Sequence, residues 1–276
     1  MAGNCYYCGM KYVVFLLLVS QISHAQRYKP QPVTGLLGAF GAEVALVKQS
    51  IQRPKTVVVD GVPFTTGRIG KQRVVVAETG IGKVNAAMTT ALMLDHFRPR
   101  RILFTGIAGG TNPNLQPGDI VIARRTIHHD YQSITFDQKP TNQTRNSVSG
   151  QANPAYFLAD SLMLLRAQAT ARTVAFEPIP ITTRPPTVVT GTVVTGDQFI
   201  SSSQKVAQLR QDFGADATEM EGAAVAQVCY QLQVPHLVIR SLSDRADDNA
   251  RRDMLSFYQT AARNSAKLVL AIVAQL

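Results

Sequence analysis

Apolar positions along the chain fall into two kinds of stretch: short β-branched runs, and longer segments with apolar residues three and four apart. The first kind is typical of buried strands and the second of amphipathic helices. Strands that alternate with helices form parallel sheets covered on both faces, so the pattern predicts a mostly parallel sheet between two helical layers. We expect strands within 33–40, 56–69 (a hairpin), 72–79, 100–110, 118–131, 187–200 and 235–244, and helices within 42–51, 82–97, 155–171, 202–213, 216–229 and 256–276.

The chain has 276 residues and is 45% hydrophobic, which suits one α/β domain with a large core. We assign this single domain to residues 34–276, after a polar linker at 26–33. The stretch 132–186 departs from the pattern because it is polar, rich in turn residues and interrupted by prolines. There we expect a surface excursion around one helix.

The first 25 residues differ in kind from the rest. Lys11 precedes an apolar run at 12–19, and Ser23 and Ala25 place small residues ahead of a cleavage point before Gln26. This order is typical of a secretory signal peptide, and the run is too short to span a membrane. We therefore predict a periplasmic or secreted protein rather than a cytoplasmic one, with no membrane anchor after cleavage. A buried first helix or strand is the alternative, and Met10 is a second candidate start of translation.

Composition narrows the classes of ligand and partner. Cys5 and Cys8 precede the cleavage point and have no second ligand pair, while Cys229 is expected to pack as a small hydrophobe. His128 and His129 are adjacent, so their side chains diverge, and we expect neither a metal nor another cofactor. The net charge of +10 is spread along the chain instead of forming a stripe, which argues against a nucleic-acid partner.

Carboxylates gather where a ligand is expected. Ligands of open α/β sheets bind beyond the carboxyl ends of the strands, and there the chain places Glu43 after the first strand and Asp244 at the end of the last. Glu219 and Glu221 begin the alanine-rich helix, where the helix dipole alone explains a capping carboxylate. We expect Glu219 to pair with Arg240 and Glu221 to point toward the ligand. Glu43, Glu221 and Asp244 are then expected to converge on one cleft.

Eight segments follow one another along the chain: GLLGAFGAEVALV, TGIGKVNAA, TGIAGG, GDIVIA with HHD, TGDQFI, TEMEGAAVAQVC, PHLVIRSLSDRAD and LSF. In their order and spacing they resemble the methylthioadenosine/S-adenosylhomocysteine nucleosidases of the nucleoside phosphorylase superfamily. The resemblance covers nearly all of the chain from Thr34, the excursion excepted, and is specific in combination although each piece is weak alone. It implies a Rossmann-like three-layer α/β sandwich with a central mixed sheet flanked by helices, a homodimer, and a small-molecule purine nucleoside as the substrate.

The resemblance also implies roles for individual residues. Glu221 would bind the ribose hydroxyls, Asp244 would protonate the purine at N7, and Glu43 would deprotonate the attacking water. Because the glycosidic bond breaks through an oxocarbenium-like sugar, a carboxylate beneath the ribose and an acid at the base suit this chemistry. The substrate-binding residues implied are Ile107, Ala108, Gly109, Phe136 (5′-tail pocket), Phe199 and Ile200 (base), Met220 (sugar), Ser243 and Phe257 (cover).

Hydrolysis is favoured over phosphorolysis. Phosphorylases of the superfamily bind phosphate with arginines, one of them in the first loop, where this chain reads AFGAEV and an anionic Glu43 would repel phosphate. Phosphorolysis is the first alternative. The second is a secreted relative that only binds or stores nucleosides, and the presence of all three acids argues against it. Ile107 where serine is common, Gly41 and Ala42 where acids are common, and the long excursion leave the 5′ substituent and the purine open.

Overall fold

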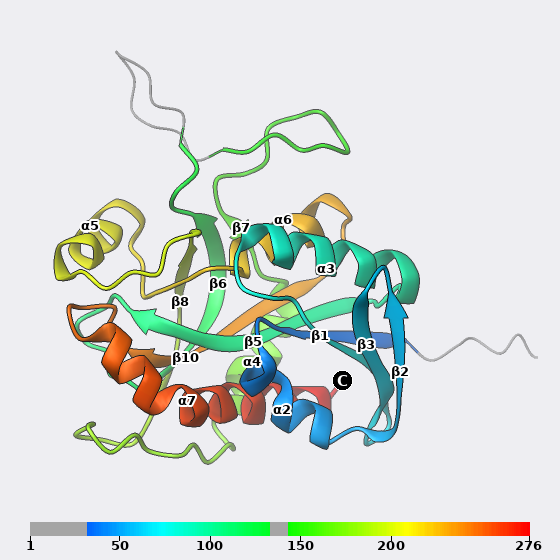
Figure 1. The fold of residues 1–276 in the computed structure, drawn as a ribbon, viewed down its shortest axis with the longest axis horizontal. Coiled ribbons are helices and arrows are strands. Elements are labelled where there is room, and N and C mark those ends of the chain that lie inside the picture. Colours follow the sequence, from blue (N-terminus) through cyan, green and yellow to red (C-terminus); the bar gives the residue numbers. More distant parts are fainter. Residues whose placement is uncertain (1–31, 133–142) are drawn as a thin grey trace, which may run out of the picture. The chain divides into compact units, whose positions relative to one another are not determined.

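The structure, a computed structural model, describes residues 32–132 and 143–276, and residues 32–276 form one compact unit. The predicted signal peptide, most of the linker and Phe136 lie outside the described residues. Within them, ten strands form one sheet with helices on its two faces (Figure 1). The strands are β1 (Val33–Gly38), β2 (Gln52–Val59), β3 (Val62–Ile69), β4 (Gln72–Glu78), β5 (Arg101–Gly110), β6 (Ile120–His128), β7 (Phe157–Leu158), β8 (Val188–Thr195), β9 (Ala217–Glu219) and β10 (His236–Asp244).

Helices cover the sheet in two groups. On one face, α3 and α6 pack on each other and on the sheet, and on the other face α7 packs against both α2 and α4. None of the described helices is both long and apolar enough to cross a bilayer. The helices are α2 (Gly41–Gln49), α3 (Lys83–Phe97), α4 (Ser161–Ala171), α5 (Ser203–Phe213), α6 (Gly222–Gln231) and α7 (Ala250–Val273).

The two faces of the sheet carry separate hydrophobic clusters. Leu37 and Phe104 pack with residues of α3 and α6, whereas their neighbours Leu36 and Leu103 pack with residues of α2, α4 and α7. Successive strand residues point to opposite faces, so the continuous apolar runs of β1 and β5 serve both clusters. Cys229 is fully buried in the first cluster, where it packs as a small hydrophobe.

The expectation of a mostly parallel sheet is wrong, and the mixed sheet is confirmed. Five strand pairs are parallel (β1–β4, β1–β5, β5–β10, β6–β8, β8–β9) and five are antiparallel (β2–β3, β3–β4, β5–β9, β6–β7, β6–β10). Asp60 and Gly61, both with positive φ, form the tight turn that makes β2–β3 antiparallel. Elsewhere β5, β10, β6, β8 and β9 pair in a closed ring, which no local pattern predicts.

Three element boundaries differ from the predictions. The helix predicted at 155–171 begins at Ser161, because the Asp160 carboxylate caps it by accepting from the Met163 N–H at 2.9 Å. Before it, Phe157–Leu158 forms a short strand beside β6. The helix predicted from 216 begins at Gly222, after the short strand β9, and the last helix begins at Ala250, six residues earlier than predicted.

Candidate active site

A cavity of about 350 Å³ lies at the carboxyl ends of β1, β5 and β10. These strands run parallel, so the segments that follow them meet at one edge of the sheet. The residues before α6, the first turn of α2 and the second and third turns of α7 also line it. The predicted site residues that line it are Glu43, Ile107, Ala108, Gly109, Phe199, Met220, Glu221, Ser243 and Asp244.

Glu43 enters the cavity from the first turn of α2. Its carboxylate oxygens accept hydrogen bonds from the backbone N–H groups of Ala39 and, at 2.8 Å, Ile107. A Cβ on Gly106 would lie 2.7 Å from Oε1 of Glu43, so the glycine of β5 lets this carboxylate approach the strand. Burial raises the pKa of Glu43 to about 7, although Arg240 and the two N–H donors oppose the shift.

Glu221 is the residue that precedes α6, yet its side chain does not cap that helix. Its Oε1 instead accepts from the N–H of Gly82, in the loop after β4, at 2.9 Å. Burial, followed by the nearby Glu219 carboxylate, raises the pKa of Glu221 to about 8. The Glu221 side chain therefore connects the residue before α6 to the residue before α3 at the cavity wall.

Asp244 ends β10 and is buried. Its Oδ2 accepts from the Ser243 hydroxyl at 2.6 Å, and its Oδ1 accepts from the Ala246 N–H at 2.7 Å. Burial raises the pKa of Asp244 to about 6 against these two donors. Glu43, Glu221 and Asp244 thus bring three carboxyl groups with raised pKa values to one cavity, from three separate elements.

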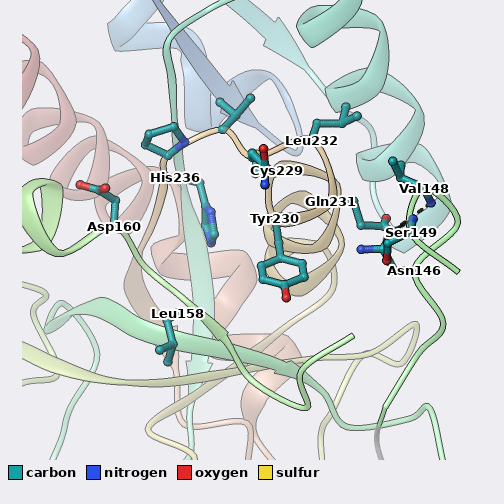
Figure 2. A pocket seen from close by; sticks show the side chains of 13 residues that line it. Asn146, Val148, Ser149, Leu158, Asp160, Cys229, Tyr230, Gln231, Leu232 and His236 are labelled. Atoms are coloured by element: carbon teal, nitrogen blue, oxygen red, sulfur yellow. Dashed lines mark hydrogen bonds between the residues drawn. The ribbon is translucent and has the colours of Figure 1, made fainter. Parts of the chain in front are cut away.

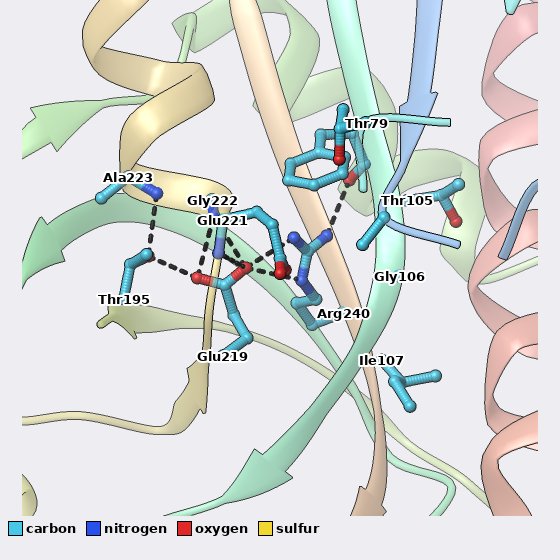
Figure 3. Close-up of polar contacts among 12 residues, drawn as sticks. Thr79, Thr105, Gly106, Ile107, Thr195, Glu219, Glu221, Gly222, Ala223 and Arg240 are labelled. Carbon is cyan, nitrogen blue, oxygen red and sulfur yellow. Dashed lines mark hydrogen bonds and ion pairs between the residues drawn. The ribbon is translucent and has the colours of Figure 1, made fainter. Parts of the chain in front are cut away.

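Glu219 pairs with Arg240, as the sequence predicted (Figure 3). Nη2 of Arg240 lies 2.6 Å from Oε2 of Glu219, and both side chains are buried, with 1% and 3% exposure. The carboxylate also accepts from the Gly222 N–H, at 2.7 Å to Oε2, and from the Thr195 hydroxyl, so Glu219 rather than Glu221 caps α6. The guanidinium stacks 4.1 Å from the Phe104 ring centroid. Glu219 and Arg240 together form the floor behind the cavity.

Two predicted site residues do not line the cavity, and a third lies outside the described residues. Ile200 is buried in a separate cluster with Ile127, Val194 and Leu209. Phe257 lies on α7, but Met254, Leu255 and Tyr258 of that helix line the cavity instead. The packing of α7 on the sheet decides which of its residues face the cavity, and the motif alone does not encode it. Phe136 lies outside the described residues.

Most of the apolar wall of the cavity was not predicted from the sequence. Phe40 and Tyr258 meet with ring centroids 6.1 Å apart, and Ile81, Met254 and Leu255 continue this wall. Ile81 and Leu255 are 57% and 61% exposed, so the wall reaches the surface of the chain. Only the position of Phe40, just before the helix of Glu43, offered a signal in the sequence.

The acids of the cavity predict how stability depends on pH. In the folded state Glu43 and Glu221 hold protons up to about pH 7 and 8, whereas unfolded carboxyl groups release them near pH 4.5. The folded state therefore binds more protons than the unfolded state, and stability rises as pH falls from 8 toward 6.5. Below pH 6.5 the buried histidines, with lowered pKa values, act in the opposite direction; they are His128, His129 and His236.

We expect the thermal unfolding midpoint of the unliganded protein to be higher at pH 6.5 than at pH 8. Glu221→Gln, which keeps the shape and removes the titration, is expected to shrink this difference. Glu177→Gln is the matched control, because Glu177 lies in a partly exposed ion pair with Arg263 and Lys267. An equal midpoint at the two pH values, or an unchanged difference in Glu221→Gln, would contradict the assignment.

Metal-binding groups do not converge in the described residues: no three His, Cys, Asp or Glu side chains are placed to hold an ion. Nε2 of His128 lies 3.0 Å from Oε1 of Gln227. The His129 ring packs against Gly196, where a Cβ would meet it at 2.4 Å. Both histidines are buried and neither lines the cavity.

A larger cavity, of about 850 Å³, lies at the other end of β10, where His236 begins the strand that Asp244 ends (Figure 2). Its titratable groups do not form a reactive cluster. Asp160 caps α4, burial raises the pKa of the Cys229 thiol, and burial lowers the pKa of His236 to about 4. This cavity has no convergent acids, so we place the active site at the smaller one.

Comparison with known proteins finds relatives along most of the chain. Residues 33–274 match the sequence model of the phosphorylase superfamily. The 5′-methylthioadenosine/S-adenosylhomocysteine nucleosidase of Geobacillus sp. (strain WCH70) is 37% identical over 242 residues, which cover 87% of this chain and 97% of the relative.

Solved structures of related proteins also match this chain over most of its length. The nucleosidase of the same name from Neisseria meningitidis, in complex with methylthio-immucillin-A, has a TM-score of 0.77 and 36% identity, covering 88% of this chain and 99% of the other. The futalosine hydrolase of Helicobacter pylori strain 26695 has a TM-score of 0.77 and 28% identity, covering 89% and 98%.

Proposed function

The chain belongs to the 5′-methylthioadenosine/S-adenosylhomocysteine nucleosidases of the phosphorylase superfamily, and we propose that it hydrolyses the N-glycosidic bond of adenine nucleosides. The observation that carries the proposal is the set of three buried carboxyl groups, from Glu43, Glu221 and Asp244, on one cavity. A cavity of about 350 Å³ lies in the size range of small-molecule sites.

Each acid has a separate task in the reaction. Glu43 accepts a proton from water, and the water oxygen bonds to C1′ of the ribose as the bond from C1′ to N9 breaks. The electron pair of that bond leaves with the adenine, which takes a proton at N7 from Asp244. Glu221 accepts hydrogen bonds from the ribose hydroxyls and, in its ionised form, stabilises the positive charge that develops on the sugar. The products are adenine and a free sugar.

The raised pKa values of Glu43 and Asp244 suit their two tasks. A general base works best when its pKa lies near the working pH, and burial brings the pKa of Glu43 to about 7. An acid must hold its proton close to neutral pH, and burial brings the pKa of Asp244 to about 6. A hydrogen bond from the protonated Asp244 to a purine nitrogen favours the protonated form and raises its pKa further.

The lining favours water over phosphate as the nucleophile. Among the described residues that line the cavity, there is no Lys, Arg or His. Arg240, which does not line the cavity, is already paired with Glu219. A phosphate ion would meet carboxyl groups without a compensating cation, which costs energy in a buried site. This supports hydrolysis over the phosphorolysis that other members of the superfamily perform.

The apolar wall supports a small apolar 5′ substituent. Ile81, Met254 and Leu255 offer no polar atoms from their side chains, and Phe40 and Tyr258 add aromatic surface. A methylthio group gains from such contacts, whereas a 5′ hydroxyl loses its bonds to water without replacement. We therefore rank 5′-methylthioadenosine ahead of adenosine.

Adenine release by the chain from Gln26, in phosphate-free buffer, tests the proposal. We expect release from 5′-methylthioadenosine and S-adenosylhomocysteine, slower release from adenosine, and loss of release in Glu43→Gln. Glu78→Gln is the matched control, because Glu78 forms a partly exposed ion pair with Lys48 outside the cavity. No release from any adenine nucleoside would overturn the proposal, and bound but uncleaved nucleosides would favour a binding or storage protein.

We also propose export and a homodimer. The signal-peptide pattern before Gln26 supports export, and a mature chain that begins at another residue or retains the apolar run would contradict it. The apolar side chains of Ile81, Val84 and Met88 are 57%, 78% and 50% exposed beside the cavity mouth, which supports a covering partner. Light scattering at the mass of one chain would contradict the homodimer.

A further inference from the structure

Three charged side chains that do not line the cavity meet beside its rim. Lys83 is the first residue of α3, Asp130 follows β6, and Asp197 follows β8. Nζ of Lys83 lies 2.6 Å from Oδ1 of Asp130 and 3.7 Å from Oδ2 of Asp197. Lys83 and Asp130 are largely buried, with 21% and 14% of their side chains exposed. One cation thus holds two carboxylates from two other segments of the chain.

Backbone hydrogen bonds complete this cluster. The Lys83 N–H donates to Oδ1 of Asp197, and the Asp197 N–H donates to Oδ2 of Asp130, each at 2.8 Å. Gly82, the residue before α3, has no side chain to cap the helix, so Asp197 supplies the capping carboxylate from 114 residues away. The three segments are tied to one another at both side-chain and backbone atoms.

The cluster holds two loops that carry residues of the site. Gly82, directly before Lys83, donates its N–H to Oε1 of Glu221 at 2.9 Å. Phe199, two residues after Asp197, lines the cavity. Gly80 and Gly82 have φ of 80° and 97°, where glycine has most freedom, so this loop needs an outside anchor to keep one conformation.

We propose that Lys83, Asp130 and Asp197 form a latch that positions Glu221 and Phe199 for the nucleosidase reaction. This inference rests on the proposed function, and it makes Lys83 and Asp130 positioning residues rather than catalytic ones. A release of the latch frees the loop at Gly82, removes the N–H donor from the Glu221 carboxylate and lets the Phe199 segment move. Displacements of about 1 Å in a reacting site cost on the order of 100-fold in rate.

The test compares Lys83→Met, Asp130→Asn and the double variant in the full chain. Each single variant is expected to lower kcat/KM for 5′-methylthioadenosine by about 10- to 100-fold. The double variant is expected to lose little more than either single one, because the first change already opens the latch. Lys267→Met is the matched control, since Lys267 forms an ion pair of similar length, 2.8 Å, with Glu177 away from the cavity.

Two further readouts separate positioning from general destabilisation. Loss of the Gly82 donor raises the pKa of Glu221, so the acidic limb of the pH profile of kcat/KM is expected to move to higher pH in Lys83→Met but not in Lys267→Met. Hydrogen exchange of peptides covering 79–83 and 196–200 is expected to be faster in Lys83→Met alone. Equal activity, pH profile and exchange in Lys83→Met and Lys267→Met would overturn the latch.

Failure of the latch and failure of the proposed function give different results. An unchanged chain that releases adenine while Lys83→Met behaves as Lys267→Met rejects the latch alone. An unchanged chain that releases no adenine rejects the proposed function, and the exchange of peptides 79–83 and 196–200 then still decides whether the latch holds the loops.

Discussion

Replacement of Asp244 by asparagine is expected to lower kcat/KM for adenine release by about 100- to 10,000-fold, the range that a single general acid contributes. Asparagine has nearly the same shape but no proton to give to N7 of the purine. Its amide can still accept from the Ala246 N–H and donate to the Ser243 hydroxyl, the two groups that Asp244 contacts at 2.7 and 2.6 Å. The loss is therefore expected in the chemical step, with the fold retained.

Thermal stability separates this explanation from damage to the fold. Because burial raises the pKa of Asp244, its ionised form costs stability above about pH 6, and asparagine removes that cost. Asp244→Asn is expected to unfold at or above the midpoint of the unchanged protein at pH 8. Asp95→Asn, at a side chain that is 78% exposed and far along α3, is the matched control and should change neither property. Full activity in Asp244→Asn would remove Asp244 from the mechanism.

The second large effect is expected from Arg240→Met, which should lower the free energy of unfolding by about 3–5 kcal/mol. The substitution leaves Glu219 buried without its cation, beside Glu43 and Glu221. It also removes the opposing charge that holds down the pKa of Glu43 and Glu221, so both carboxyls become harder to ionise. The loss of stability comes mainly from the Glu219 carboxylate, which stays buried without a cation.

Urea unfolding measures this prediction, and two variants control it. Arg263→Met removes a surface partner of Glu177 and is expected to cost no more than about 1 kcal/mol. Glu219→Gln combined with Arg240→Met removes both charges and is expected to recover part of the loss, since no buried ion is left alone. A loss in Arg240→Met no larger than in Arg263→Met would show that the pair does not hold the floor of the site.

The acids of the site were predictable because a general rule places them. Glu43 and Asp244 follow parallel strands, and the carboxyl ends of such strands meet at one edge whatever the other details of the fold. The pairing of Glu219 with Arg240, a residue of a later strand, was also predicted from the sequence, which left Glu221 free to face the cavity. The positions of these four acids at the ends of predicted strands and at the start of a predicted helix sufficed to bring them to one cavity.

The remaining parts of the site depend on contacts between distant segments. Met254 and Tyr258, rather than Phe257, line the cavity because of how α7 packs on β10. The capping of α3 by Asp197 joins residues 114 positions apart, and no local signal at Lys83 indicates it. The closed ring through β9, a strand of three residues, has the same origin in tertiary contacts. Such features follow from packing, which short patterns do not encode.

The most direct test of hydrolysis is the identity of the sugar product formed in phosphate buffer. The chain from Gln26 is incubated with 5′-methylthioadenosine and inorganic phosphate, and the products are followed by proton and phosphorus NMR. The site predicts adenine and free 5-methylthioribose in equal amounts, at a rate that does not change with phosphate concentration. A new phosphorus signal from a sugar 1-phosphate, at a rate that rises with phosphate, would contradict the hydrolytic account.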